Sequence, residues 1–261
     1  MRNLAEINFD INEMTNRVAF GIPLKDSEGN PFPEDLLQSY LDSAIAWAEQ
    51  TLNIVIMPRE ELEEHDYFLT DYTNWGFIRL WKKPIIEVES LEMWYGEQKM
   101  FDIPKDWLKI DKLSGQISLF PTSGSAGGMI ITASGGLVTP LLTGNIGYAP
   151  KLWRVRYKAG LEAPDPNEPH VYRQNHIHPN LIECIYKKAA IGVMGVYGDL
   201  IIGPGIANQS ISLDGISQSV GTTQSAMFGG ASARIDQLQK DIDSYIPALR
   251  SYYDGINMTV I

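Results

Sequence analysis

Three segments of the chain have the residue spacing of amphipathic helices, and a long run of strand-like segments separates the first from the other two. The first helical segment begins at Pro33 and has acidic residues in its first turn, and both features favour a helix start. Leu37, Leu41 and Ala48 follow at spacings that share one helix face. The pattern predicts a helix over residues 33–53.

The other two helical segments follow the strand-like run. One begins near Pro179, and its Gly192 and Gly195 are expected to leave room for close approach of the helix backbone to a neighbour. The other covers residues 231–253, where apolar residues repeat three and four positions apart. Pro247 lies inside this last segment and is expected to kink the helix.

Between the first and second helical segments, five stretches are rich in β-branched and aromatic residues. Proline and glycine separate them, which is typical of short strands joined by turns. They predict a small antiparallel sheet: FIRLW, IIEVESLEMWY, WLKIDKLSGQISLF, GMIITAS and LWRVRYKAG. With the helices, they indicate an α+β fold, in which a bundle of about three helices carries a small antiparallel β-sheet insertion and extended arms.

This order divides the chain into four parts. Residues 1–30 end in a turn-like sequence and are expected to form an extended N-terminal arm. Residues 31–202 form the core, which includes a glycine-rich excursion over 121–150. Residues 203–230 form a linker or interaction loop, and residues 231–261 form the C-terminal helix and tail.

The charge balance restricts the partners that the chain can hold. Its 261 residues are 44% hydrophobic, which suffices for a full core. The formal net charge of -11 disfavours a gripping role on nucleic acid or on an anionic membrane. Cys184 is the only cysteine, so an internal disulfide is excluded, and no apolar stretch is long enough to span a bilayer. We expect a soluble protein made in a cytoplasm, without a membrane partner.

The histidines are the strongest candidates for metal ligands. His176, His178 and Glu183 lie close together in sequence, with His170 upstream, and imidazole and carboxylate groups are ordinary zinc ligands. The spacing, however, is not that of a helical HExxH site or of a zinc knuckle. We expect these histidines to be unliganded, and keep as the alternative a metal-dependent hydrolase that uses His176 and His178.

Other catalytic patterns are missing from the sequence. There is no GxSxG nucleophile elbow, and Cys184 falls on an apolar helix face, where a thiol behaves as a small hydrophobe. The segment GPGIAN lacks the third glycine of a dinucleotide fingerprint, and no GxxxxGK[ST] loop occurs. We therefore expect no enzyme activity and no cofactor.

The order of the elements resembles that of the head-tail connector, or adaptor, proteins of tailed double-stranded DNA bacteriophages. In that family a helix is followed by a proline-led strand, a hairpin of the form D...G.I, a strand of the form v.Y.aG and a second helix. The resemblance covers residues 36–200. The matching positions are Pro84, Val88, Asp111, Gly115, Ile117, Val155, Tyr157, Ala159 and Gly160.

Membership of that family would imply a structural virion protein of the neck. Identical subunits, commonly twelve, would form a ring between the portal protein and the tail or neck proteins, and DNA would pass through without specific binding. The arm, the excursion and the long C-terminal part make this chain larger than the compact members of the family. A tail or baseplate interaction module of another type is a further alternative.

The stretch QSISLDGISQSV, residues 209–220, lies within the linker and alternates apolar and serine residues. Ile211 and Leu213 share one phase, and Ile216 follows one step out of phase after a turn-like Asp214-Gly215 pair. A strand edge of this kind has unpaired backbone groups that a neighbouring chain can complete. We hypothesise that it pairs with another subunit or with the portal; the alternative is a simple mobile loop.

Two further segments supply candidate contact residues. The C-terminal Met258, Val260 and Ile261 form an apolar end that a partner surface could cover. The acidic segment EELEEHD, residues 60–66, is expected to be a solvated loop or face, with a functional negative surface as the alternative. If subunits surround DNA, a negative wall would ease its passage, and the candidate channel-facing residues are Glu60, Glu61, Glu63 and Glu64.

Overall fold

The computed structural model describes residues 7–26, 28–70, 77–119, 147–164, 175–202, 208–213, 216–221 and 231–253. The chain divides into two compact units. A sheet unit contains residues 53–177 with Tyr252 and Tyr253, and a helical unit contains residues 7–52 and 178–251. Helices and antiparallel sheets together confirm the predicted α+β class in broad terms.

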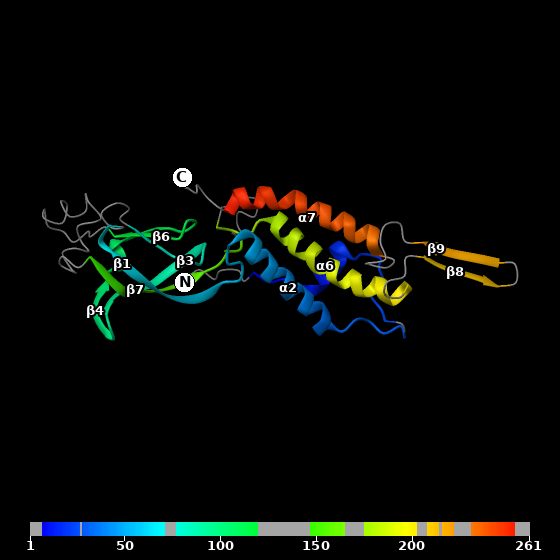
Figure 1. Cartoon of the computed structure of the whole chain (residues 1–261), viewed down its shortest axis with the longest axis horizontal. Coiled ribbons are helices and arrows are strands. Elements are labelled where there is room, and N and C mark those ends of the chain that lie inside the picture. The colour runs from blue at the N-terminus through cyan, green and yellow to red at the C-terminus, as the bar shows by residue number, and fades with distance from the viewer. Residues whose placement is uncertain are drawn as a thin grey trace. The chain divides into compact units, whose positions relative to one another are not determined.

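Among its described residues, the helical unit contains four helices, and Figure 1 shows α2, α6 and α7 beside one another. Their bounds are α1 Ile11–Val18, α2 Glu34–Leu52, α6 Pro179–Ile202 and α7 Ser232–Tyr253. The predicted limits of the last three hold to within two residues. The first was not predicted and lies within the segment expected to be an extended arm. It begins where the carboxylate of Asp10 accepts a hydrogen bond from the backbone N–H of Asn12 at 2.8 Å, which caps the helix.

Close packing between α2 and α6 depends on one glycine. A Cβ atom at Gly192 would lie 2.4 Å from the Cδ1 atom of Tyr40, so the tyrosine ring occupies the space that any larger residue would need. The predicted close approach is confirmed at this position. It was wrong for Gly195, where a Cβ atom would have no neighbour within 4 Å among the described atoms.

Among the described residues, the sheet unit contains two antiparallel sheets that share one hydrophobic core. The four-stranded sheet has the order β1-β7-β3-β4, and the three-stranded sheet has the order β2-β6-β5. The bounds are β1 Arg59–Phe68, β2 Phe77–Arg79, β3 Ile85–Tyr95, β4 Gln98–Ile103, β5 Leu108–Asp111, β6 Gln116–Leu119 and β7 Tyr148–Ala159, with a short 3-10 helix at Lys105–Trp107. Trp153 and Tyr157 from the first sheet and Ile117 from the second are fully buried in this core. The predicted segment GMIITAS lies outside the described residues.

The acidic segment 60–66 is part of strand β1, so the expectation of a loop was wrong. In a strand, successive side chains point to opposite faces. Here Glu63 and Tyr67 are buried on the core face, whereas Glu60 and Leu62 are exposed on the other. The negative charge on the exposed face is tolerated because β7 supplies basic partners, such as Arg154 opposite Glu64.

Two glycines shape the ends of these strands. Gly115 closes the β5–β6 turn with a φ of +75°, and its N–H donates to the carbonyl of Asp111 at 3.0 Å. Gly160 follows β7 with a φ of +143°, and its N–H donates to the carbonyl of Pro84 at 2.9 Å. Both backbone conformations are ones that residues with a Cβ rarely adopt.

A separate two-stranded sheet interrupts the chain between α6 and α7. It pairs β8, Asn208–Leu213, with β9, Ile216–Gly221, in antiparallel orientation (Figure 1). None of the described helices combines the length and apolar character that crossing a membrane requires.

Candidate interaction surfaces

The β8–β9 hairpin contains three of the predicted contact residues. Leu213 pairs with Ile216, and Ile211 pairs with Gln218. Because directly paired residues of an antiparallel hairpin share a face, Ile211, Leu213 and Ile216 all belong to the same face. In the sequence Ile216 is one step out of phase with Ile211 and Leu213, and its direct pairing with Leu213 across the hairpin brings it to the same face.

The four candidate channel-facing carboxylates have different surroundings on β1. Glu60 is exposed to solvent. Glu61 accepts a hydrogen bond from Arg59 at 2.8 Å. Glu64 forms ion pairs with Arg154 at 2.7 Å and Lys151 at 2.9 Å, and hydrogen bonds from these two side chains lower the pKa of its carboxyl. These three carboxylates therefore remain at least partly exposed, in contact with solvent or with basic side chains.

Glu63, in contrast, is buried and organises a polar cluster below β1. Its carboxylate accepts hydrogen bonds from the hydroxyl of Tyr157 and from the backbone N–H groups of Trp81, at 3.1 Å, and Lys82, at 3.3 Å. His65 Nε2 lies 2.8 Å from the same carboxylate. Burial opposes ionisation, but the hydrogen bonds from His65 and Tyr157 outweigh it and lower the pKa of Glu63. Glu63 is thus a structural clamp between β1, β7 and the segment after β2.

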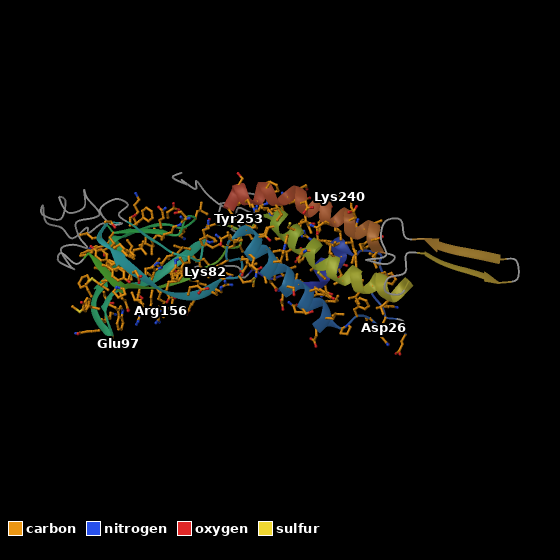
Figure 2. All side chains as sticks on the ribbon, viewed as in Figure 1. Asp26, Lys82, Glu97, Arg156, Lys240 and Tyr253 are labelled. Carbon is orange, nitrogen blue, oxygen red and sulfur yellow. The ribbon has the colours of Figure 1, made fainter. Side chains whose placement is uncertain are left out.

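The outer face of the four-stranded sheet is charged. Arg154 lies 4.0 Å from the centre of the Trp94 ring and pairs with Glu64. Arg156 is exposed one pair further along, between Leu62 of β1 and Ser90 of β3 (Figure 2). The basic central strand β7 is therefore flanked by mainly acidic neighbours.

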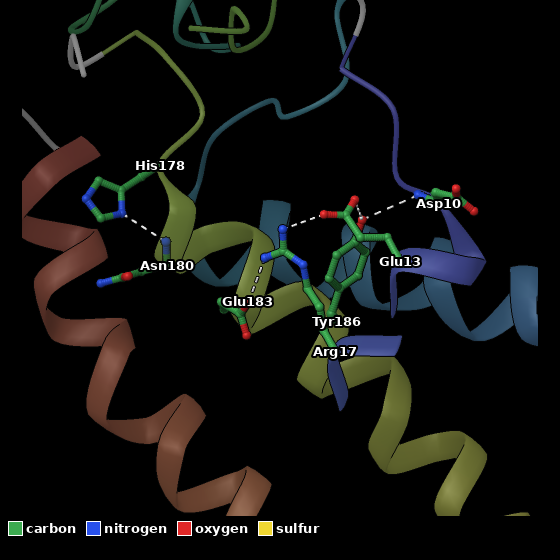
Figure 3. A network of polar contacts seen from close by, with 7 residues as sticks. All are labelled: Asp10, Glu13, Arg17, His178, Asn180, Glu183 and Tyr186. Carbon is green, nitrogen blue, oxygen red and sulfur yellow. Dashed lines mark hydrogen bonds and ion pairs between the residues drawn. The ribbon is translucent and has the colours of Figure 1, made fainter. Parts of the chain in front are cut away.

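A polar network joins α1 to α6 in the helical unit (Figure 3). Arg17 binds the carboxylate of Glu183 at 2.8 Å and also pairs with Glu13. The hydroxyl of Tyr186 donates to Glu13 at 3.0 Å and accepts from the N–H of Asp10 at 3.4 Å. Burial, followed by the hydrogen bond to Glu13, raises the pKa of Tyr186 to about 12. The network fixes α1 against the bundle.

Of the two histidines of the hydrolase alternative, His178 is engaged through its imidazole and His176 through its backbone carbonyl. His178 Nδ1 accepts a hydrogen bond from the N–H of Asn180 at 3.1 Å at the start of α6 (Figure 3). The backbone carbonyl of His176 accepts from the hydroxyl of Tyr253 at 3.2 Å. Glu183 is engaged by Arg17, and His170 lies outside the described residues. Across the described part of the chain, no group of three His, Cys, Asp or Glu side chains is arranged to hold a metal ion.

We expect a chelator to leave the melting temperature unchanged. A metal bound only to the native state would stabilise it by mass action, so removing it would lower that temperature. The measurement is a thermal unfolding curve of the purified chain with and without EDTA, with a known zinc protein as the positive control. A decrease of several degrees would contradict the expectation.

The comparisons with known proteins give matches to solved structures alone. No protein-family model matches the chain, and no curated protein gives a significant match. It is similar to a chain from the neck of an empty gene transfer agent particle with C6 symmetry, with a TM-score of 0.42, 15% identity, and coverage of 90% of this chain and 94% of that chain. A chain from the neck of the native particle with C12 symmetry gives a TM-score of 0.40, 15% identity, and coverage of 90% and 93%. A chain from the virion of the native particle gives 0.43, 15%, and 72% and 82%.

Sequence reasoning missed a set of exposed apolar side chains in the sheet unit. Trp81 is 67% exposed and its ring lies 4.9 Å from that of His65. Phe68 and Tyr148 are both partly exposed, and their ring centres are 4.8 Å apart at the paired ends of β1 and β7. The sequence shows only that aromatic residues lie at or near the ends of strands. Such residues occur both in the core and on the surface, so the sequence does not distinguish the two. Met258, Val260 and Ile261 lie outside the described residues.

Proposed function

We propose that this chain is a structural protein of a phage-type neck, in which identical copies form a ring between the portal and the tail and DNA passes through the centre. The observation that carries the proposal is the ordered pattern of family-like residues from α2 to α6. Each motif of that pattern coincides with an element of the fold: the proline-led strand is β3, the D...G.I hairpin is β5–β6, and the v.Y.aG strand is β7.

The residues of the pattern hold the fold rather than perform chemistry. Val155 and Tyr157 fill the core of the sheet unit, and Asp111 accepts the hydrogen bond that closes the turn at Gly115. A pattern that recurs because it specifies a scaffold suits a structural protein, whose function lies in its surfaces.

The side chains that could act as a general base or a nucleophile also have structural roles. Glu63 is ionised and fully hydrogen-bonded. Cys184 is buried, and burial raises the pKa of its thiol to about 11, which makes it a poor nucleophile. The metal-dependent hydrolase finds no support among the described residues.

For the channel wall we propose Glu60, Glu61 and Glu64, which are the three of the four candidate carboxylates that remain at least partly exposed on β1. A negative wall repels phosphate and lets DNA slide past. Glu63 is left out, because its carboxylate is turned into the cluster beneath the strand. A ring whose bore is lined by lysine and arginine would contradict this assignment.

The C-terminal tail is proposed as a docking segment for the portal or the adjacent subunit. Deleting residues 257–261 is expected to leave the melting temperature unchanged, because the described core lies in the helices and the two sheets. Portal binding is expected to weaken, since burial of each apolar side chain contributes about 1.5–3 kcal/mol before the cost of ordering the segment. Unaltered binding of the truncated chain would discard the docking role, and a large decrease in melting temperature would place these residues in the core.

The tail or baseplate alternative is separated from the ring proposal by partner choice. The full-length chain is mixed with purified portal protein and, separately, with purified tail components, and co-sedimentation is measured. Binding to the portal is the expected result. Binding to tail components without binding to the portal would favour the alternative.

A further inference from the structure

The β8–β9 hairpin lies in a segment almost without charge. Residues 201–233 contain a single charged residue, Asp214, in a chain of which 20% is charged, and the two strands contain none. Strands at the edge of a sheet in monomeric proteins are commonly protected by charged residues, because their unpaired backbone groups would otherwise pair with other chains. Both edges of this hairpin lack that protection.

The register divides the hairpin into two unlike faces. Ser210 pairs with Ser219 and Ser212 pairs with Ser217, so four of the six positions on one face are serines, and Asn208 and Gly221 complete it. The other face contains the four apolar positions Ile211, Leu213, Ile216 and Val220, together with Gln209 and Gln218. A two-stranded ribbon is marginally stable alone in water and needs further strands or a covering layer. Within the described residues its two strands pair with each other and with no third strand.

We propose that the β8–β9 hairpins of neighbouring copies pair edge to edge, with β9 of one copy beside β8 of the next. The two strands are antiparallel and have equal lengths of six residues, so each added hairpin continues an antiparallel sheet. Because the two edges differ, the contact is head-to-tail, which is the kind of contact that closes a ring. The inference rests on the proposed ring and names one of its subunit contacts.

A second copy fits this hairpin better than an unrelated partner. A single strand from another protein would complete one edge and leave the other unpaired, whereas identical copies in a ring use both. Uncharged strands also avoid repulsion between copies that each have a net charge of -11. The result is a continuous ribbon with serine-rich positions on one face and mainly apolar positions on the other.

The test is disulfide trapping between variants of the full-length chain that each have one added cysteine beside the native Cys184. One copy has Ser210→Cys or Ser212→Cys on β8, and the co-expressed copy has Ser217→Cys or Ser219→Cys on β9, which gives four combinations that sample the registers. One added cysteine per chain excludes a disulfide within one hairpin, and the native Cys184 does not compete because it is buried. The exposed Ser39→Cys variant on α2 serves as the control for random collisions.

We expect at least one mixed combination to give a covalent dimer, on oxidation and non-reducing electrophoresis, that neither variant gives alone. The mass of the same samples without oxidant is measured by light scattering. A ring mass without a covalent dimer in all four combinations would overturn the hairpin contact and leave the ring standing. Dimers formed by a single β8 variant alone would overturn the head-to-tail arrangement, and a monomer mass without cross-linking would count against both proposals.

Discussion

Replacing Gly160 with alanine is expected to lower the free energy of unfolding by about 3–5 kcal/mol. The φ of +143° at this position is available to glycine and strained for alanine. The added Cβ would also lie 2.6 Å from the Cα and 2.9 Å from the N of Pro58. These are backbone atoms, so the clash is relieved only by moving the start of β1 away from the end of β7. Urea denaturation of both chains measures the effect.

The matched control is Gly96→Ala. Gly96 also has a positive φ, at +59°, but a Cβ there would have no neighbour within 4 Å among the described atoms. It should therefore cost only the backbone strain, about 1 kcal/mol. Equal losses for the two variants would show that the contact with Pro58 contributes nothing.

Replacing Glu63 with alanine is expected to cost about 3 kcal/mol of stability. The substitution removes the acceptor of the Tyr157 hydroxyl, which is fully buried, and of the backbone N–H of Trp81, whereas the N–H of Lys82 keeps the Tyr157 hydroxyl as an acceptor. A buried donor left without a partner costs about 1–3 kcal/mol. The control is Glu60→Ala on the exposed face of the same strand, which should change stability by less than about 0.5 kcal/mol. If Glu63→Ala lowered stability no more than Glu60→Ala does, the structural role assigned to Glu63 would be wrong.

The effect of Glu63 should depend on pH. The pKa of this carboxyl is lower in the folded chain than in the unfolded one, so the ionised group stabilises the fold above the unfolded pKa, near 4.3. This contribution is lost as the pH falls through the folded pKa. The difference in stability between the parent chain and Glu63→Ala should therefore be largest at neutral pH and shrink below about pH 4.

The helices were predictable because their sequence signals are local. The helical spacing of apolar residues in α2 and the proline at the start of α6 can both be recognised within a short stretch of sequence. In the structure α2 covers Glu34–Leu52 and α6 begins at Pro179. The short α1 was missed because its one strong sequence signal is the N-cap at Asp10. The helix is held in place by contacts between residues far apart in the sequence, Arg17 with Glu183 and Tyr186 with Glu13. Contacts of this kind depend on the tertiary structure and produce no periodic pattern of apolar residues in the sequence.

The acidic strand shows the opposite limitation. A run of carboxylates indicates a solvated segment when each residue is considered alone. Arg154 and Lys151, which neutralise Glu64, lie far along the chain, and Tyr157 and Trp81, which satisfy Glu63, are equally remote. The pairing of β1 with β7 makes the strand stable, and a single sequence does not contain that pairing.

The hairpin lies between these two cases. The alternation of serine and apolar residues indicated a strand edge, and the structure forms one at residues 208–213 and 216–221. Ile216 is one step out of phase in the sequence, and its face follows only from the hairpin register, in which it pairs directly with Leu213.

Negative-stain imaging of the full-length chain mixed with its cognate portal protein tests the ring most directly. We predict rings of this chain with a central opening, stacked on one end of the portal, and a mass that corresponds to many copies per portal. Portal particles without an added ring, together with a chain that stays monomeric in the same mixture, would contradict the account.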